Sequence, residues 1–199
     1  MIKMKKETEI KLTVASSKYW IETVMNDFNA FLQDHADCER KASAMAMSFV
    51  AKYPDRTEII PKLIATALEE LKHFQQVYRI LQKKGIQLTH EIPEDPYIKQ
   101  LVQLSRTGRE ERFLDRLLIA AVVECRGAER FKMVHEALED KELKLFYQKL
   151  YESETKHGNI FLEMARNYFD ELAIQRRLAQ LVLEEGRILS GLKLRAALH

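Results

Sequence analysis

The sequence has few residues that interrupt helices and no feature that marks export. Its 199 residues include only 6 Gly and 4 Pro, so the chain has few places to turn, and no run of alternating β-branched residues predicts a strand. No stretch of 18 apolar residues occurs, and the basic N-terminus lacks the apolar core of a signal peptide. These absences argue against a membrane protein and predict a cytoplasmic one.

Cysteine is also scarce. The two cysteines, Cys38 and Cys125, fit a reducing compartment and cannot supply the Cys-x-x-Cys pairs of a rubredoxin-type iron site. The formal net charge of +2 and the pI near 8.4 permit an RNA partner without arguing for one.

The abundant residues are helix formers, and apolar residues recur at helical spacing. The sequence therefore predicts an all-α fold with five long helices, at about 16–52, 58–84, 109–137, 141–168 and 171–194. Thr57 is expected to cap the second helix, with Pro61 in or near its first turn, and Gly85 is expected to end it.

We expect residues 1–199 to form one domain, which opens with a charged lead-in over 1–15. The connection over 85–108, with room for a short helix near 97–105, is long enough to cross the molecule. Residues 169–195 are expected to add a C-terminal helix to four helices of a bundle.

Two of the predicted helices carry a Glu-x-x-His unit. Glu70 and His73 lie in LEELKHF, and Glu154 and His157 lie in YESETKHG. On an α-helix this spacing puts a carboxylate and an imidazole on one face, one turn apart, which is the separation that a divalent metal needs.

A lone glutamate on the preceding helix faces each of these units. Glu39 lies 16 residues before the turn near Asp55, and Glu70 lies 15 after it; at about 1.5 Å per residue the two carboxylates stand at one height. Glu124 and Glu154 lie 15 residues on either side of the next turn. Packed together, the two hairpins would form a ferritin-like four-helix bundle with four carboxylates and two imidazoles on its axis.

Such a set of ligands predicts a di-iron centre. A buried carboxylate without counter-charge costs several kcal/mol, and two metal ions would remove that cost. Oxygen-rich sites with one imidazole per metal suit iron or manganese. The predicted ligands are Glu39, Glu70, His73, Glu124, Glu154 and His157. Small residues leave space beside them: Ser43, Ala67, Ala121, Gly127, Ala128 and Gly158.

The ligands alone leave the chemistry open. A carboxylate-bridged di-iron centre can reduce O2 and attack a C–H bond, or it can oxidise iron or peroxide, as in a ferritin-like or rubrerythrin-like protein. A metal-free helical interaction module is a third interpretation.

Four segments resemble a known family, the tRNA 2-methylthio-N6-isopentenyladenosine hydroxylases (MiaE). They are DHADCERKASAMAM (34–47), EELKHF (69–74), VVECRGAERFK (122–132) and YESETKHGNIFLEMA (151–165), and the resemblance extends from about Ser16 to Leu194. It implies a non-haem di-iron monooxygenase with two Fe ions, which hydroxylates the isopentenyl group of the modified adenosine in the tRNA anticodon loop. O2 and an external electron donor of the ferredoxin or reductase type would be needed. All six predicted ligands match the family in type and order.

The roles of several neighbours stay open. His35, one turn before Glu39, either supports the metal site or is an ordinary buried polar residue. Cys38 and Cys125 point away from the ligands and are expected to pack. Three aromatic residues either line a pocket for the prenyl chain or belong to the core: Phe74, Tyr151 and Phe161. The candidate phosphate contacts, which a solvated surface would explain equally well, are Arg106, Arg109, Arg112, Arg116, Arg126, Arg130, Arg176 and Arg177.

Overall fold

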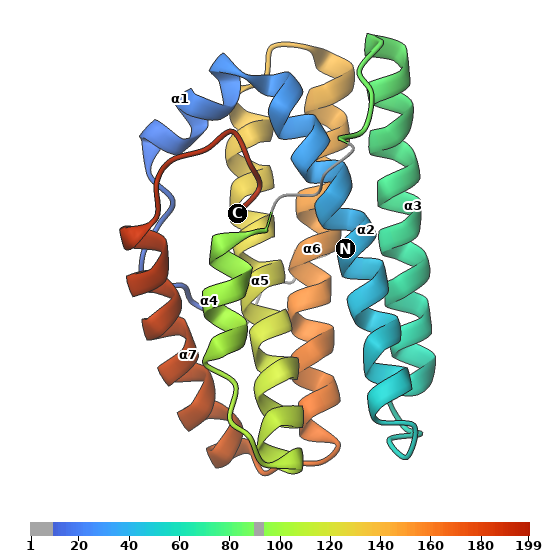
Figure 1. Cartoon of the computed structure of the whole chain (residues 1–199), viewed down its shortest axis with the longest axis vertical. Coiled ribbons are helices and arrows are strands. Elements are labelled where there is room, and N and C mark those ends of the chain that lie inside the picture. Colours follow the sequence, from blue (N-terminus) through green and yellow to red (C-terminus); the bar gives the residue numbers. More distant parts are fainter. Residues whose placement is uncertain (1–9, 90–93) are drawn as a thin grey trace, which may run out of the picture. The chain divides into compact units, whose positions relative to one another are not determined.

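The computed structural model describes residues 10–89 and 94–199 (Figure 1). Over these ranges the chain forms seven helices and no strand, which confirms the all-α prediction. None of the helices in these ranges combines the length and the hydropathy that crossing a bilayer requires.

Contacts divide the chain into two compact units. The α2–α3 unit comprises Tyr19–Glu94 and Leu194–Leu198, and the α4–α7 unit comprises Asp95–Lys193, His199 and the N-terminal residues up to Lys18. We describe each unit by itself.

The α2–α3 unit begins with a broken helix. Residues Lys18–Asn26 form α1 and Phe28–Lys52 form α2, so the prediction of one continuous helix over 16–52 is wrong. Asp27 causes the break, because its backbone leaves the helical region (φ −138, ψ 65) and its carboxylate accepts a hydrogen bond from the Ala30 N–H at 3.1 Å. When an Asp side chain caps the first turn of a new helix, its backbone cannot also continue the preceding helix.

Helix α3 spans Ile60–Lys84 and pairs with α2 in an antiparallel hairpin (Figure 1). Its N-cap is Ile59, without a side-chain hydrogen bond, so the prediction that Thr57 caps it is wrong. The predicted end is confirmed: Gly85 has a φ of 68° and donates its N–H to the last turn of α3.

Residues that follow the last helix also belong to this unit. The Trp20 indole donates a hydrogen bond to the Ala197 carbonyl at 3.0 Å, and the Leu198 N–H donates to the Asp34 carboxylate at 2.7 Å. Residues 194–198 thus pack against α1 and α2, which helical periodicity could not reveal.

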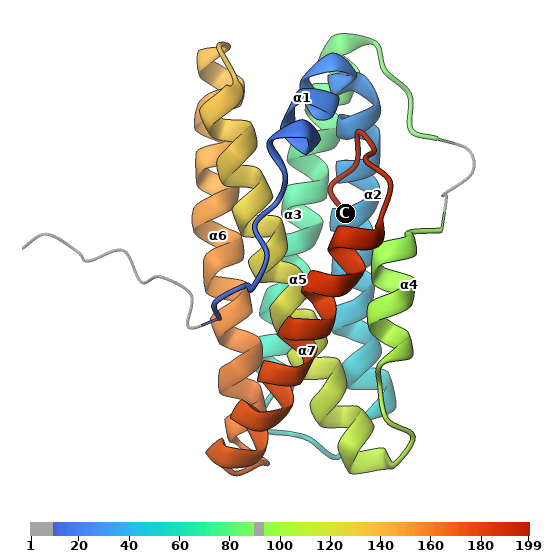
Figure 2. The same ribbon diagram turned by 90° about the vertical axis from the view of Figure 1, so that its left-hand side faces the viewer.

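The α4–α7 unit is built on a second hairpin. Helices α5 (Arg109–Ala137) and α6 (Lys141–Arg166) pair antiparallel, and α4 (Pro96–Gln103) and α7 (Glu171–Gly191) pack beside α5 (Figure 2). The predicted bounds of α5 are confirmed, while α6 ends two residues and α7 three residues earlier than predicted.

A buried ionic cluster joins the helices of this unit to the N-terminal segment. The Arg126 guanidinium donates two hydrogen bonds to Glu185, at 2.8 and 2.9 Å, and a third to the Val14 carbonyl at 2.7 Å. The Tyr97 hydroxyl donates to Glu185 at 2.9 Å. Burial opposes the charge of Arg126, but the hydrogen bonds and charge of Glu185 raise its pKa above the ordinary value. The part of the predicted lead-in that the structure describes is therefore held by specific contacts.

Candidate metal centre

The α2–α3 unit brings three of the predicted ligands together. Glu39 comes from α2, and Glu70 and His73 come from α3; all three side chains are buried. His73 Nδ1 lies 3.3 Å from Glu70 Oε2 and 3.7 Å from Glu39 Oε2. One potential ligand atom from each residue lies within 4.8 Å of the other two. We refer to Glu39, Glu70 and His73 as the α2–α3 half-site.

His35 touches this half-site directly. Its ring is fully buried, and Nε2 lies 2.6 Å from Glu39 Oε1, which is hydrogen-bond distance. Its ring also packs against Phe31, with centroids 5.9 Å apart. Of the two interpretations of His35, the geometry favours the one in which it supports the site, because it fixes the rotamer of the Glu39 carboxylate.

The α4–α7 unit contains a matching set. Glu124 comes from α5, and Glu154 and His157 come from α6; all three are buried. His157 Nδ1 lies 3.0 Å from Glu154 Oε2, and one potential ligand atom from each residue lies within 4.8 Å of the other two. We refer to these residues as the α5–α6 half-site.

The donor chemistry of both half-sites fits a metal ion. Each half-site offers two carboxylates and one imidazole, and the exposed fractions of the six residues range from 1% to 8%. Both histidines turn Nδ1 toward the glutamate three residues earlier, so one ring atom and one carboxylate converge from a single helix face. Buried negative charge of this density calls for a counter-ion, and carboxylate with imidazole is a donor set that iron accepts.

The two cysteines are placed by packing contacts within their own units. The Cys38 thiol lies 3.7 Å from the Asp34 carboxylate, one turn away on α2. The buried Cys125 thiol lies 3.6 Å from the Ile10 carbonyl. These contacts agree with the packing roles that the sequence predicts.

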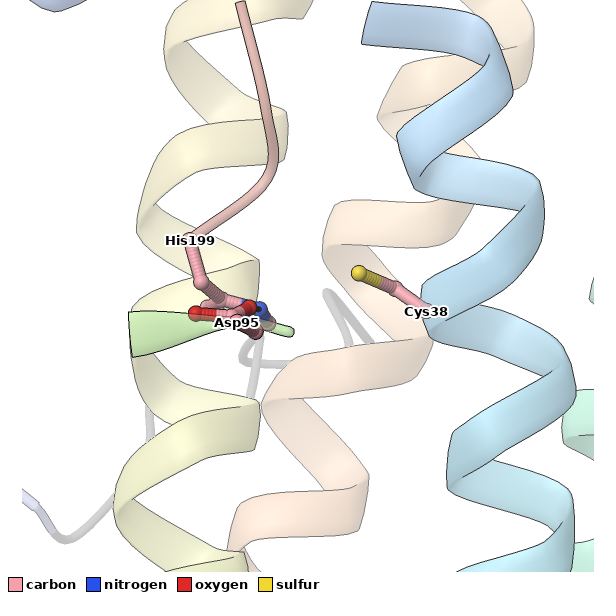
Figure 3. A group of neighbouring side chains, drawn as sticks. All are labelled: Cys38, Asp95 and His199. Atoms are coloured by element: carbon pink, nitrogen blue, oxygen red, sulfur yellow. Dashed lines mark ion pairs between the residues drawn. The ribbon is translucent and has the colours of Figure 1, made fainter. Parts of the chain in front are cut away.

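His199 lies against Asp95 and Tyr97 in the α4–α7 unit. Figure 3 shows His199 beside Asp95, and it labels Cys38 on its own helix; His199 Nδ1 lies 3.7 Å from Asp95 Oδ2. The His199 ring stacks on Tyr97, with ring centroids 5.2 Å apart.

The arginines proposed as phosphate contacts divide into three groups. Arg126 and Arg130 are buried, so the prediction that they touch RNA is wrong. Arg106 and Arg177 bind the fully buried Asp115 carboxylate, at distances from 2.8 to 3.0 Å. The other four stay predictions: Arg109, Arg112, Arg116 and Arg176.

Sequence reasoning missed the importance of Glu185. It lies on the buried stripe of α7 after Ile174, Leu178 and Leu181, at spacings of four, three and four residues. A charged residue on such a stripe needs a buried partner of opposite charge. The position of Glu185 in the sequence could therefore have predicted a buried basic partner, which in the structure is Arg126.

The chain is similar to proteins of a known family. A sequence model of the family described as tRNA-(MS[2]IO[6]A)-hydroxylase (MiaE) matches residues 3–199. A relative from Pseudomonas putida, named tRNA 2-(methylsulfanyl)-N(6)-isopentenyladenosine(37) hydroxylase, is 36% identical over 157 residues, which are 79% of this chain and 76% of the relative. A protein of the same name from Salmonella typhimurium is 31% identical over 109 residues, 55% of this chain and 40% of the relative.

A solved structure shares the fold. It is described as protein 43 with aldehyde deformylating oxygenase activity from Synechococcus, and it matches with a TM-score of 0.89 and 31% identity over 94% of this chain and 93% of its own. The predicted fold class, all-α and ferritin-like, is confirmed. The match over residues 3–199 and the identity to the Pseudomonas relative show that this chain belongs to the MiaE family of tRNA hydroxylases.

Proposed function

We propose that this protein is an O2-dependent non-haem di-iron monooxygenase that hydroxylates the isopentenyl group of 2-methylthio-N6-isopentenyladenosine in tRNA. The observation that carries the proposal is the pair of equivalent half-sites, each with two buried carboxylates and one imidazole whose donor atoms lie within 4.8 Å. Membership of the MiaE family supports the substrate.

In this proposal the two half-sites hold two iron ions in one centre. Each half-site supplies three donors and two negative charges, which suits one iron ion. The metal ligands are Glu39, Glu70 and His73 from one unit, and Glu124, Glu154 and His157 from the other. Residues 1–199 then act as a single ferritin-like domain, because neither unit alone holds a complete set.

The reaction adds one atom of O2 to a C–H bond and reduces the other to water, with two electrons and two protons. When bound, the iron pair supplies the reduction of O2 and the attack on the C–H bond. The protein contributes the buried surroundings, which keep water away from the ligands. His35 orients Glu39, and His73 and His157 keep their rings aligned with the neighbouring carboxylates.

The open position at Gly127 supports the proposal of space for O2 or the prenyl chain beside Glu124. Gly127 lies one turn further along α5 and is buried, and no heavy atom of the described residues outside its own helix backbone and chain neighbours lies within 4 Å of the point where its Cβ would stand. A packed core would fill such a position. Phe74, Tyr151 and Phe161 remain candidates for lining a pocket for the prenyl chain.

The partners follow from the reaction. The tRNA anticodon loop is the substrate, so the protein acts in the cytoplasm, and exposed arginines such as Arg109 and Arg112 supply phosphate contacts. The proposed electron source is an external donor of the ferredoxin or reductase type.

The test uses iron-loaded protein, tRNA that carries the isopentenylated nucleoside, O2 and dithionite with a mediator. Mass analysis of the digested tRNA should show the modified nucleoside gaining one oxygen atom. Glu124→Ala should reduce the yield at least about 100-fold, whereas Glu163→Ala, an exposed glutamate on α6, should have no effect. An unchanged nucleoside with fully iron-loaded parent protein would refute the proposal.

A further inference from the structure

Helix α3 has two chemically different faces. One is buried and carries Glu70 and His73. The other leaves four large apolar side chains in water, with exposed fractions of 42% for Ile64, 63% for Leu68, 51% for Leu71 and 37% for Tyr78. Their spacing of four, three and seven residues places them on one stripe along the helix. We refer to these four residues as the α3 stripe.

Isolated exposed apolar residues are normal, but a continuous stripe indicates an interaction surface. Among the described residues no other helix exposes four large apolar side chains. On α7, for comparison, the two exposed leucines, Leu172 and Leu183, lie three turns apart. The α3 stripe is therefore a distinct feature of this helix.

The charge around the stripe is mostly positive. Exposed basic residues outnumber exposed acidic ones on α3, where Glu69 is the one exposed carboxylate. A partner that covers the stripe must therefore be acidic at its rim. At the helical angle per residue, Lys72, Arg79 and Lys83 lie along one side of the stripe, whereas the exposed Lys62 and Lys84 lie on the other side of the helix.

This combination favours an acidic protein over two other occupants. A second copy of this chain would bring the same positive rim against itself, which opposes pairing. RNA binds through phosphate contacts and base stacking on aromatic or arginine planes. Within the stripe Tyr78 alone could stack on a base, whereas the three aliphatic side chains of Ile64, Leu68 and Leu71 suit a protein interface.

The stripe lies on the same helix as two of the proposed iron ligands. Leu68 and Leu71 flank Glu70 in the sequence, and the stripe lies across a single helix from Glu70 and His73. An α-helix with its side chains is about 10 Å across, so a redox centre docked on the stripe would have one helix between it and the ligands.

We propose that the α3 stripe docks a small acidic electron-transfer protein, which supplies the reducing equivalents for hydroxylation. The inference rests on the proposed function, since it assumes iron at Glu70 and His73. Two one-electron deliveries, each oxidising one donor molecule, provide two electrons. Together with the two electrons of the C–H bond and two protons, they reduce O2 to one hydroxyl group on the substrate and one water.

The first experiment measures binding by calorimetry, with an oxidised plant-type [2Fe–2S] ferredoxin as the acidic probe. The double variant Leu68→Gln/Leu71→Gln should weaken binding by about tenfold or more, and Lys72→Gln/Arg79→Gln should weaken it and reduce its salt dependence. The matched control is Leu172→Gln/Leu183→Gln, whose leucines are similarly exposed on α7; it should bind like the parent. If ferredoxin does not bind the parent, or binds Leu68→Gln/Leu71→Gln equally well, the inference is wrong.

The second experiment separates this inference from the proposed function. With dithionite as reductant, Leu68→Gln/Leu71→Gln should hydroxylate tRNA at the parent rate, whereas with reduced ferredoxin its KM for ferredoxin should rise by about tenfold or more. A loss of tRNA affinity in the same variant would assign the stripe to RNA and overturn the inference. If the parent protein is inactive with dithionite yet binds ferredoxin through the stripe, the proposed function fails and the docking surface stands.

Discussion

At the scale of single residues, the candidate centre depends on side chains that hold one another. Glu39 accepts its contact from His35 at 2.6 Å, within one helix and one turn. The ligand histidines make equivalent contacts with their own glutamates. Replacing a residue that orients a ligand should therefore weaken metal binding without removing a donor.

Substitution of His35 tests whether its contact with Glu39 strengthens metal binding. His35→Phe keeps a ring that can pack against Phe31 but loses the contact with Glu39, so iron affinity should fall by about 10- to 100-fold. His35→Gln retains a donor and should recover part of the loss. Competition titration with a chelator measures the affinity. Equal affinities for parent and His35→Phe would show that His35 is only a packing residue.

Asp115 gives a prediction about pH. Burial by itself raises the pKa of this carboxyl, but hydrogen bonds from Arg106 and Arg177 outweigh it and hold the pKa below the ordinary value. A lowered carboxyl pKa stabilises the folded state above the unfolded value of about 3.9, and that contribution is lost as the pH falls through the folded value.

Asp115→Asn should lower the free energy of unfolding at pH 7 by about 2 kcal/mol. Between about pH 5 and pH 3, the stability of the parent should fall more steeply than that of the variant. Urea unfolding at each pH measures both effects. The control is Glu111→Gln, which removes an exposed partner of Arg106 and should cost less than about 1 kcal/mol. Parallel pH profiles for parent and Asp115→Asn would contradict the assignment.

At the scale of helices, the ends depend on single residues with special backbone geometry. Gly85 ends α3 with a φ of 68°, and no atom of the described residues crowds the position of its Cβ. The cost of a side chain there would come from backbone strain alone. By contrast, a Cβ at Gly186 on α7 would lie 2.7 Å from Thr13 Oγ1 and 2.8 Å from Val14 Cγ2, so that glycine allows the N-terminal segment to approach.

Gly85→Ala should destabilise the protein by about 1 kcal/mol, because alanine resists the left-handed conformation. Gly191→Ala is the control: this glycine also has open space around it, but its φ is not positive. The control should be neutral or slightly stabilising. Thermal unfolding compares the two variants, and equal midpoints would show that α3 does not depend on its glycine cap.

At the scale of the whole molecule, the proposed iron ligands come from both units. Each half-site belongs to one unit, and bound metal would neutralise carboxylates from both. A ligand that binds only the folded state stabilises it by mass action, by about 4 kcal/mol at a thousandfold excess over the Kd. The proposal therefore predicts that metal and folding stability are coupled.

Removal of iron by a chelator should lower the unfolding temperature, and added Fe(II) should restore it under anaerobic conditions. Glu154→Ala should show a smaller shift because its α5–α6 half-site is incomplete, while Glu163→Ala should behave like the parent. Calorimetry with and without metal measures these shifts. If the unfolding temperature of the parent protein does not change with iron, the proposed iron ligands are contradicted.

The sequence alone determined the helices and the candidate ligands, because both follow from local periodicity. Helix α5 begins and ends at the predicted residues, Gly85 ends α3 as predicted, and six ligand positions fall on buried faces because Glu-x-x-His and the distances to the turns are properties of a single helix or hairpin.

Tertiary structure decided what the charged residues do. Arg126 and Arg130 are residues of the type that binds RNA phosphates, yet both are buried. Arg126 is paired with Glu185 on another helix. Asp27 breaks a helix that periodicity continues, and Trp20 binds a carbonyl 177 residues away. The amphipathic pattern specifies which side of a helix is buried. It does not specify which residue of another helix lies opposite, because that depends on how the helices pack in three dimensions.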